Sequence, residues 1–192
     1  MAIRPPRTKP LERRSPYNGR RMTEAEYLAL PEVKPYLEYV DGVVLQKPMP
    51  NVSHRRLVHF LDVELGLYIR QAGAGQAGPE QRSRLGQSPN YRLPDLSYWA
   101  PGVSDHNDSI PSLAIEVRSP DQTMGELRAK CRFYRQNGVD AAWLIDPSSR
   151  TIEVFEGKLD GVALSDAEVL TSPLLPDFEL PLKQLFATLD TP

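Results

Sequence analysis

The chain has 192 residues, of which 40% are hydrophobic and 25% are charged, and its formal net charge is −2. These values are typical of a globular protein with one domain, and the near-zero charge gives no general sign of a nucleic-acid partner. The single cysteine, Cys131, excludes an internal disulfide, and no apolar run approaches the ~20 residues of a membrane span. Since no apolar segment follows the basic start, the sequence predicts a cytoplasmic protein.

The first 21 residues differ in charge from the remainder. They carry seven basic groups against one acid, Glu12, and contribute +6 to the total, so the other residues carry a formal charge of −8. The segment is rich in proline and has no apolar periodicity, which predicts a largely disordered tail at 1–21 and a single folded domain at 22–192. A solvated tail without a partner and an arm that binds phosphates fit its composition equally well.

The first folded elements are a short helix and a hairpin. Thr23-Glu24-Ala25-Glu26 is a capping-box pattern that begins a helix. Asp41-Gly42 joins two β-rich runs, at 36–40 and 43–46, in a tight turn. Glu38 lies within the first of these strands, and the simpler interpretation is that its side chain faces solvent.

The longest predicted helix covers about residues 52–71. His54 shares its apolar face with Leu61 and Leu65. A hydrogen-bonded core histidine is the simpler alternative to a functional role at this position. After a glycine-rich connection, residues 79–86 are expected to form a strand.

Three apolar, β-rich runs and one amphipathic helical run occupy the centre of the sequence, at 93–99, 112–118, 141–146 and about 124–137. This order is typical of sheet strands with a covering helix. Two of the strands contain a carboxylate among apolar residues, Asp95 behind Pro94 and Glu116 between Ile115 and Val117. A buried carboxylate is unfavourable unless it is paired or holds a cation, so these residues are the first sign of chemistry.

The helical run at 124–137 has an inward stripe that includes Leu127, Cys131 and Tyr134. Cys131 is therefore expected to be a buried packing residue rather than a nucleophile. Lys130 flanks this stripe on the side that could reach the sheet. Its ammonium group could equally well reach water.

The last part of the chain is expected to add a hairpin, one further strand and a short helix, at 151–156 with 162–164, near 168–170 and near 182–189. No internal repeat occurs, and no low-complexity segment lies beyond the tail. The sequence therefore predicts that these elements close the domain around the central strands.

Two carboxylates on neighbouring strands suit a hard cation such as Mg²⁺ or Mn²⁺, which binds one or two carboxylates, a backbone carbonyl and waters. A nearby lysine can stabilise developing negative charge or orient an attacking water. Strand glutamates are common, so the indication of such a site comes from the order Asp95, Glu116, Lys130 on strand, strand and helix. No CxxC, HExxH, P-loop, GxSxG or GxGxxG pattern offers a competing chemistry.

Several segments together resemble the Uma-two family of restriction endonuclease-like proteins, in the PD-(D/E)XK nuclease superfamily. They are EYVDG (38–42), the helix with His54, LPDLSYW (93–99), AIEVRSPDQT (114–123), KCRFYRQNGV (130–139) and AAWLIDP (141–147). The resemblance covers about residues 23–189 and implies an α/β (α+β) fold, with a restriction-endonuclease-like mixed β-sheet flanked by α-helices. It also implies a Mg²⁺-dependent endonuclease that cleaves DNA to leave a 5′-phosphate, with a homodimer as the expected assembly.

In the family pattern, Asp95, Glu116 and the Val117 carbonyl would hold the cation. The usual lysine two residues after the second acid is replaced by Arg118, which stays protonated and cannot readily act as a base. The resemblance gives this role to Lys130 on the following helix.

The resemblance also places Glu38 and His54 at the edge of the site. Three arginines, Arg118, Arg128 and Arg132, could meet backbone phosphates of DNA. Ordinary surface charge is the simpler interpretation of any one of them.

Two other interpretations remain open. A non-catalytic module that binds nucleic acid or protein could keep the nuclease fold without turnover. A structural protein with a satisfied buried ion pair would instead show Lys130 bonded directly to Glu116, with no room for a cation.

Overall fold

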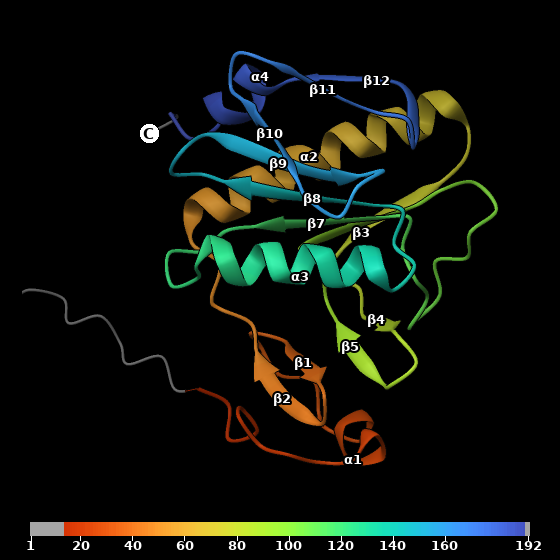
Figure 1. Cartoon of the computed structure of the whole chain (residues 1–192), viewed down its shortest axis with the longest axis vertical. Coiled ribbons are helices and arrows are strands. Elements are labelled where there is room, and N and C mark those ends of the chain that lie inside the picture. The colour runs from red at the N-terminus through yellow and green to blue at the C-terminus, as the bar shows by residue number, and fades with distance from the viewer. Residues whose placement is uncertain (1–13, 191–192) are drawn as a thin grey trace, which may run out of the picture.

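Residues 14–190 are described by a computed structural model, which shows a mixed α/β fold with four helices and twelve strands in three sheets (Figure 1). The largest sheet has six strands, in the order β10-β9-β8-β7-β6-β3. In that order, their bounds are Val162–Ser165, Thr151–Glu156, Ala141–Asp146, Leu113–Val117, Leu96–Trp99 and Gln76–Pro79. Within this sheet β7 and β8 pair in parallel, and the other neighbouring strands pair antiparallel.

The strands β7 and β8 form the centre of this sheet because both of their faces are covered. Every residue of these two strands is buried, as expected for parallel strands in a layered fold. The helix α3 (Met124–Gln136) connects them and packs on one face (Figure 1). It begins at a capping box of Thr123 and Glu126. The predicted strands at 112–118 and 141–146 and the predicted helix at 124–137 are confirmed.

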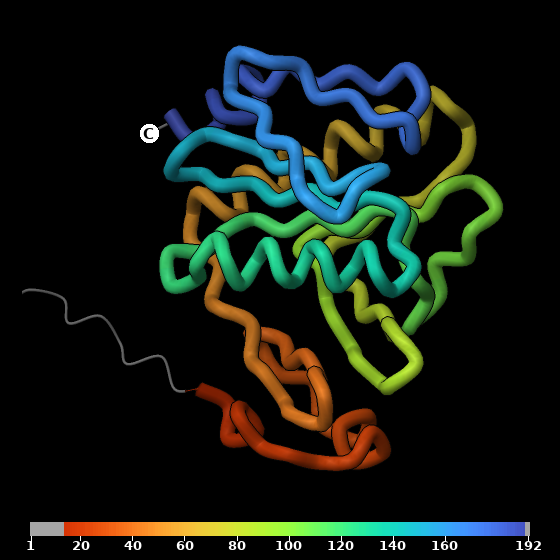
Figure 2. Tube along the Cα trace, in the orientation of Figure 1, coloured from red at the N-terminus to blue at the C-terminus, as the bar shows by residue number. Residues whose placement is uncertain are grey.

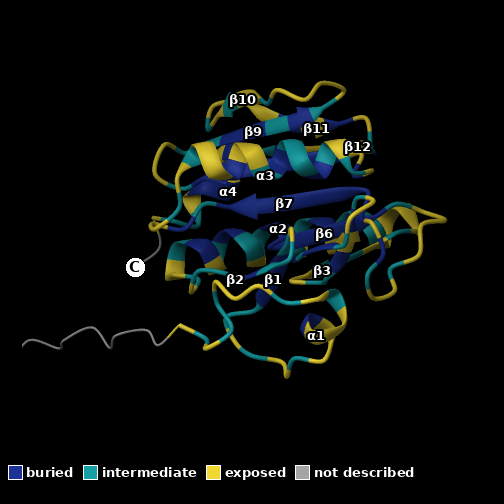
Figure 3. Cartoon of the chain, turned by 60° about the horizontal axis from the view of Figure 1, so that its bottom comes forward, coloured by how far each residue is buried: buried dark blue, intermediate teal, exposed yellow. Residues whose placement is uncertain are grey.

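The helix α2 (Val52–Ala72) covers the opposite face of the sheet together with α4 (Leu182–Ala187). Its buried leucines share a core with Ile115 and Trp143 from β7 and β8. A second core lies under α3, whose inner side is coloured as buried (Figure 3). This core contains Cys131, which is buried as expected. The two cores hold both helices firmly against the central strands.

A smaller sheet, in the order β2-β1-β5-β4, lies beside the central sheet with the short helix α1 (Figure 1). The bounds are Glu24–Leu28 for α1, Leu37–Val40 for β1, Val43–Gln46 for β2, Ser83–Leu85 for β4 and Asn90–Arg92 for β5. Its core contains three neighbouring tyrosine rings, Tyr27, Tyr39 and Tyr91, together with Leu37 and Val44. The predicted helix and hairpin are confirmed, and Asp41 and Gly42 both adopt the positive φ of a tight turn.

Three connections link this smaller sheet to the main layer (Figure 2). The chain runs from β2 through Lys47 into α2, from β3 through Glu80 into β4, and from β5 through Leu93 and Asp95 into β6. Side chains on these connections therefore lie at the junction of the two sheets.

Two predictions about element boundaries are wrong. The single strand expected at 79–86 is two strands in different sheets, β3 and β4, because the chain turns at Glu80, whose φ is +52°. Residues 14–21 of the predicted disordered tail are ordered against β2, where the Gly19 N–H donates to the Val44 carbonyl at 2.7 Å. The Val44 N–H in turn donates to the Arg20 carbonyl at 2.9 Å. Residues 1–13 of the predicted tail lie outside the described residues.

The C-terminal part contains a two-stranded sheet of β11 (Val169–Ser172) and β12 (Leu175–Pro181). The predicted strand near 168–170 and the predicted helix near 182–189 are confirmed. The sequence did not predict β12, because it contains two prolines, Pro176 and Pro181, which are unusual in paired strands. No helix within residues 14–190 is both long enough and apolar enough to cross a membrane.

Candidate active site

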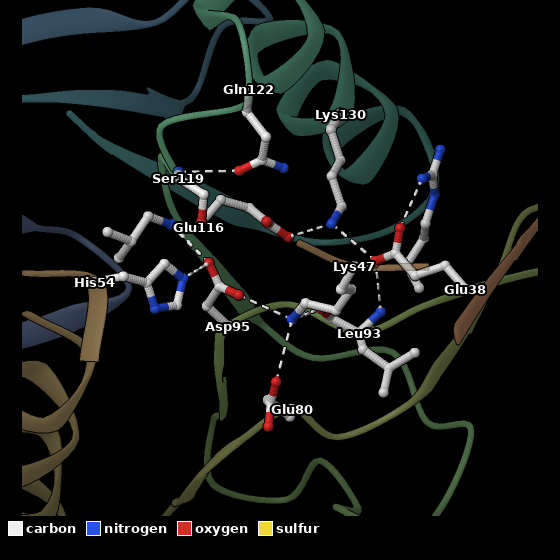
Figure 4. Close-up of polar contacts among 12 residues, drawn as sticks. Glu38, Lys47, His54, Glu80, Leu93, Asp95, Glu116, Ser119, Gln122 and Lys130 are labelled. Carbon is white, nitrogen blue, oxygen red and sulfur yellow. Dashed lines mark hydrogen bonds and ion pairs between the residues drawn. The ribbon is translucent and has the colours of Figure 1, made fainter. Parts of the chain in front are cut away.

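Three buried carboxylates converge at the junction of the two sheets (Figure 4). Glu38 lies on β1, Glu116 on β7 and Asp95 immediately before β6, and their residues are only 5%, 2% and 4% exposed. The Asp95 N–H donates to the Ile115 carbonyl at 3.0 Å, which fixes Asp95 beside the strand that carries Glu116. The fold therefore places Asp95 directly before β6, beside Glu116 on the neighbouring strand β7.

Asp95 is bonded through both of its carboxylate oxygens. Oδ1 lies 2.8 Å from Lys47 Nζ, while Oδ2 lies 2.9 Å from His54 Nε2 and accepts the Val117 N–H at 2.8 Å. Burial raises the pKa of Asp95, but the charge of Lys47 and the hydrogen bond from His54 outweigh it and hold that pKa well below its usual range. Asp95 is therefore an ionised carboxylate in the interior, and His54 is one of the residues that orient it.

Glu116 is bonded through Oε1, which accepts the Tyr134 hydroxyl at 2.7 Å and lies 2.9 Å from Lys130 Nζ. Burial raises the pKa of Glu116; the Lys130 ammonium lowers it, and the Asp95 charge raises it further. The net direction is upward. The repulsion between Asp95 and Glu116 is what a shared cation would relieve.

Lys130 joins two of these carboxylates. Its Nζ lies 2.8 Å from Glu38 Oε1 as well as 2.9 Å from Glu116, so the alternative in which this lysine reaches water is wrong. The interpretation of Glu38 as a solvent-facing residue is also wrong, because its carboxylate accepts from Arg92 Nη1 and from the Leu93 N–H, both at 3.0 Å. Burial raises the pKa of Glu38, but Lys130 and Arg92 lower it to about 2.

Two residues of this site, Lys47 and Arg92, were not predicted from the sequence. The Lys47 side chain is 8% exposed, and its Nζ lies 2.8 Å from both Asp95 Oδ1 and the Leu93 carbonyl. Lys47 stands in a Pro-rich connection without periodicity, 48 residues before its partner Asp95. The local sequence therefore holds no signal of this contact.

The three arginines expected to meet phosphates each pair with a carboxylate of the chain. The distances are 2.9 Å from Arg118 Nε to Asp146, 2.8 Å from Arg128 Nε to Glu153 and 3.0 Å from Arg132 Nη2 to Asp160. Arg118 also donates to Ser148 at 2.8 Å, and its guanidinium is turned toward the end of β8. The residue in the usual lysine position is therefore held by Asp146, and phosphate contact stays a prediction for all three arginines.

A model of the Uma2 protein family, described as "Putative restriction endonuclease", matches residues 24–183 of the chain. The chain belongs to the Uma2 family. The resemblance expected from the sequence is therefore confirmed, although no curated protein gave a significant match.

A solved structure supports the fold. It is described as a putative nuclease belonging to DUF820 from Anabaena variabilis ATCC 29413, and it matches with a TM-score of 0.77 and 24% sequence identity. The match covers 88% of this chain and 99% of the other. The mixed α/β fold of this Uma2-family chain is thus shared with a known structure, and the predicted fold class is confirmed.

The oxygen donors of the site suit the cation that the Uma2 resemblance implies. The Val117 N–H faces Asp95, and a strand residue directs its N–H and C=O to the same edge, so the Val117 carbonyl faces that side as well. Two carboxylates and a carbonyl match the preference of Mg²⁺ and Mn²⁺ for oxygen ligands. Across residues 14–190, however, no group of three or more His, Cys, Asp or Glu side chains could hold a metal ion. The predicted site would therefore combine two acidic side chains with backbone and water oxygens.

The charges of the site are already balanced. We define the buried ion cluster as three carboxylates and three cations: Glu38, Asp95, Glu116, Lys47, Arg92 and Lys130. Each carboxylate touches at least one cation of the cluster. A divalent cation would therefore have to share the carboxylates with the lysines.

Proposed function

We propose that this Uma2-family protein is a metal-dependent endonuclease that hydrolyses phosphodiester bonds in DNA. One observation carries the proposal: two carboxylates from neighbouring strands, Asp95 and Glu116, are buried side by side with two lysine ammonium groups. A buried ion pair is rarely better for stability than apolar residues of the same size. Its presence in the core therefore favours a functional role.

In this proposal Asp95, Glu116 and the Val117 carbonyl hold Mg²⁺ or Mn²⁺. When bound, such a cation stabilises negative charge on the phosphoryl group and lowers the pKa of a bound water. His54 and the Val117 N–H fix the orientation of Asp95 by bonding to its Oδ2. These two contacts restrict the Asp95 carboxylate to one orientation.

Lys130 acts in this proposal as a cation beside the scissile phosphate. Burial lowers the pKa of Lys130, but Glu116 and Glu38 outweigh that effect and raise it. The side chain therefore stays an ammonium group that stabilises developing negative charge and orients a water, rather than a base that removes a proton. Glu38 is the positioning residue that holds Lys130 from the other side, at 2.8 Å.

A non-catalytic interaction module with the nuclease fold is the second candidate. It is favoured by the balanced charges of the buried ion cluster and by the direct contact between Lys130 and Glu116. This contact is also the one expected of a purely structural ion pair. The two candidates differ in turnover, which an assay can measure directly.

Incubation of purified protein with plasmid DNA and Mg²⁺ or Mn²⁺ tests the proposal. We expect the wild type to cleave the DNA and the cleavage rate to fall at least about 100-fold in Asp95→Asn. The matched variant is Asp121→Asn, since Asp121 is exposed on a loop, and its cleavage rate should equal that of the wild type. Equal cleavage by wild type and Asp95→Asn would refute the proposed site. DNA binding without any cleavage by the wild type would favour the non-catalytic module.

A further inference from the structure

Lys47 is buried at the candidate metal site, and the roles described above make no use of it. It belongs to the connection between β2 and α2, and its Nζ contacts Asp95 Oδ1 and the Leu93 carbonyl, both at 2.8 Å. A lysine is rarely buried without a partner, and here the partner is one of the two acids that would hold the cation. The position of Lys47 therefore bears directly on metal binding.

Of the two carboxylate oxygens of Asp95, only Oδ1 can readily exchange its present partner for a metal ion. Oδ2 is held by His54 and by the Val117 N–H, which belongs to the backbone of β7 and cannot move away. Oδ1 is held by the flexible side chain of Lys47. A divalent cation that binds Oδ1 meets the Lys47 ammonium at the same atom, and two cations repel each other there.

Lys47 differs from Lys130 in its other partners. Lys130 is bonded to Glu38 as firmly as to Glu116, so it keeps a buried carboxylate if Glu116 turns to a metal ion. The other carboxylate at ion-pair distance from Lys47 is Glu80, whose Oε1 lies 3.8 Å from Nζ, while Glu116 and Glu38 act on the Lys47 charge from farther away. The Glu80 side chain is 41% exposed, and it approaches the ammonium group from a different direction than Asp95 (Figure 4).

We propose that Lys47 is the internal counter-ion of the metal site. In the metal-free protein its ammonium neutralises Asp95; when a divalent cation binds, it leaves Asp95 and pairs with Glu80. This inference rests on the proposed metal site. It follows that Lys47 lowers the affinity for the cation, because the contact between Lys47 and Asp95 must break first. It also follows that Lys47 protects the metal-free fold from an unpaired buried carboxylate.

Calorimetric titration of Mn²⁺ into the full chain, without DNA, tests this inference independently of catalysis. We expect Lys47→Met to bind Mn²⁺ at least about tenfold more tightly than the wild type, since it removes the competing charge from Asp95. Lys183→Met is the matched control: it makes the same change at an exposed lysine on α4, outside the buried ion cluster. We expect its affinity to stay within about threefold of the wild type.

Urea denaturation tests the role of Lys47 in a second way. In the presence of a chelator Lys47→Met should unfold at lower urea than the wild type, and Mn²⁺ should restore more stability to the variant than to the wild type. If Lys47→Met does not fold, the exposed variant Glu80→Gln still decides the question. It should weaken Mn²⁺ binding by about two- to threefold, since Lys47 loses its second partner.

The outcomes separate this inference from the proposed function. If Lys47→Met binds Mn²⁺ as tightly as the wild type or more weakly, the proposed role of Lys47 is overturned and the metal site stays intact. If Lys47→Met fails to fold, unchanged Mn²⁺ affinity in Glu80→Gln leads to the same conclusion. The absence of Mn²⁺ binding in the wild type and in every variant would overturn the metal site and the role of Lys47 together.

Discussion

The helix α3 carries ion pairs on two sides, and these pairs are buried on the inner side and exposed on the outer side. On the inner side Lys130, with a side chain 12% exposed, is bonded to Glu116 and Glu38. On the outer side Arg132, with a side chain 42% exposed, is bonded to Asp160, which is 86% exposed. Exposed pairs add little to stability because water and salt screen them, whereas removal of one partner of a buried pair leaves an uncompensated charge. The comparison shows that the inner pairs are costly to assemble and damaging to break, which is typical of a site retained for function.

We expect the largest loss of stability in Lys130→Met, which removes the cation on the inner side of α3. The variant leaves Glu116 and Glu38 buried with one cation fewer, so we expect the free energy of unfolding to fall by about 3 to 5 kcal/mol. Arg132→Met on the outer side is the matched control and should not change stability measurably. Urea denaturation gives both values. If Lys130→Met and Arg132→Met lose the same free energy of unfolding, the two sides of α3 do not differ in the way proposed.

A smaller loss is expected when one hydrogen bond of the inner side is removed. Tyr134→Phe deletes the hydroxyl that donates to Glu116 Oε1 at 2.7 Å, and a bond to a buried carboxylate contributes about 1.5 to 3 kcal/mol. Tyr68→Phe, on α2, is the matched control, since the Tyr68 ring packs against Tyr98 and Phe178. Thermal or urea unfolding measures the difference. A loss of stability in Tyr68→Phe as large as in Tyr134→Phe would show that the effect does not come from the hydrogen bond to Glu116.

The exposure of the Arg118 side chain, 22%, lies between that of Lys130 and that of Arg132, and its guanidinium is paired with Asp146. We expect Arg118→Met to lower stability by about 1 kcal/mol and to leave Mn²⁺ affinity within about threefold, because the guanidinium contacts neither Asp95 nor Glu116. Urea denaturation and calorimetric titration give the two values. A loss of Mn²⁺ binding would show that this residue serves the metal site after all.

Control variants aside, the smallest stability effect is expected for Arg128→Met, whose side chain is 44% exposed and paired with Glu153. The change in the free energy of unfolding should stay below about 1 kcal/mol. If Arg128 contacts a DNA phosphate, the variant should bind DNA more weakly, and the slope of log affinity against log salt should become shallower by about one. An unchanged slope would remove Arg128 from the DNA-binding surface.

The centre of this fold could be predicted from the sequence because its signals are local. Continuous apolar runs predicted β7 and β8, a capping box predicted the start of α3, and acids within apolar strands predicted Asp95 and Glu116. His54 was also a candidate, since it lies on the apolar face of its helix, and its ring is bonded to Asp95.

The remaining parts of the site depend on contacts that local patterns do not encode. Lys47 meets Asp95 across 48 residues, and Lys130 meets Glu38 across 92. The burial of Glu38 follows from the packing of a second sheet beside the first, and the sequence predicted only its hairpin. The strand β12 was missed because prolines and polar residues interrupt its apolar pattern.

Anomalous diffraction from crystals grown with Mn²⁺ would locate the proposed cation itself. We expect one strong peak within about 2 to 2.5 Å of an oxygen of Asp95, an oxygen of Glu116 and the Val117 carbonyl. Lys47 should then have moved from Asp95 toward Glu80. A structure in which Lys47 and Lys130 keep their present carboxylate partners, with no peak between Asp95 and Glu116 at saturating Mn²⁺, would contradict the proposed metal site.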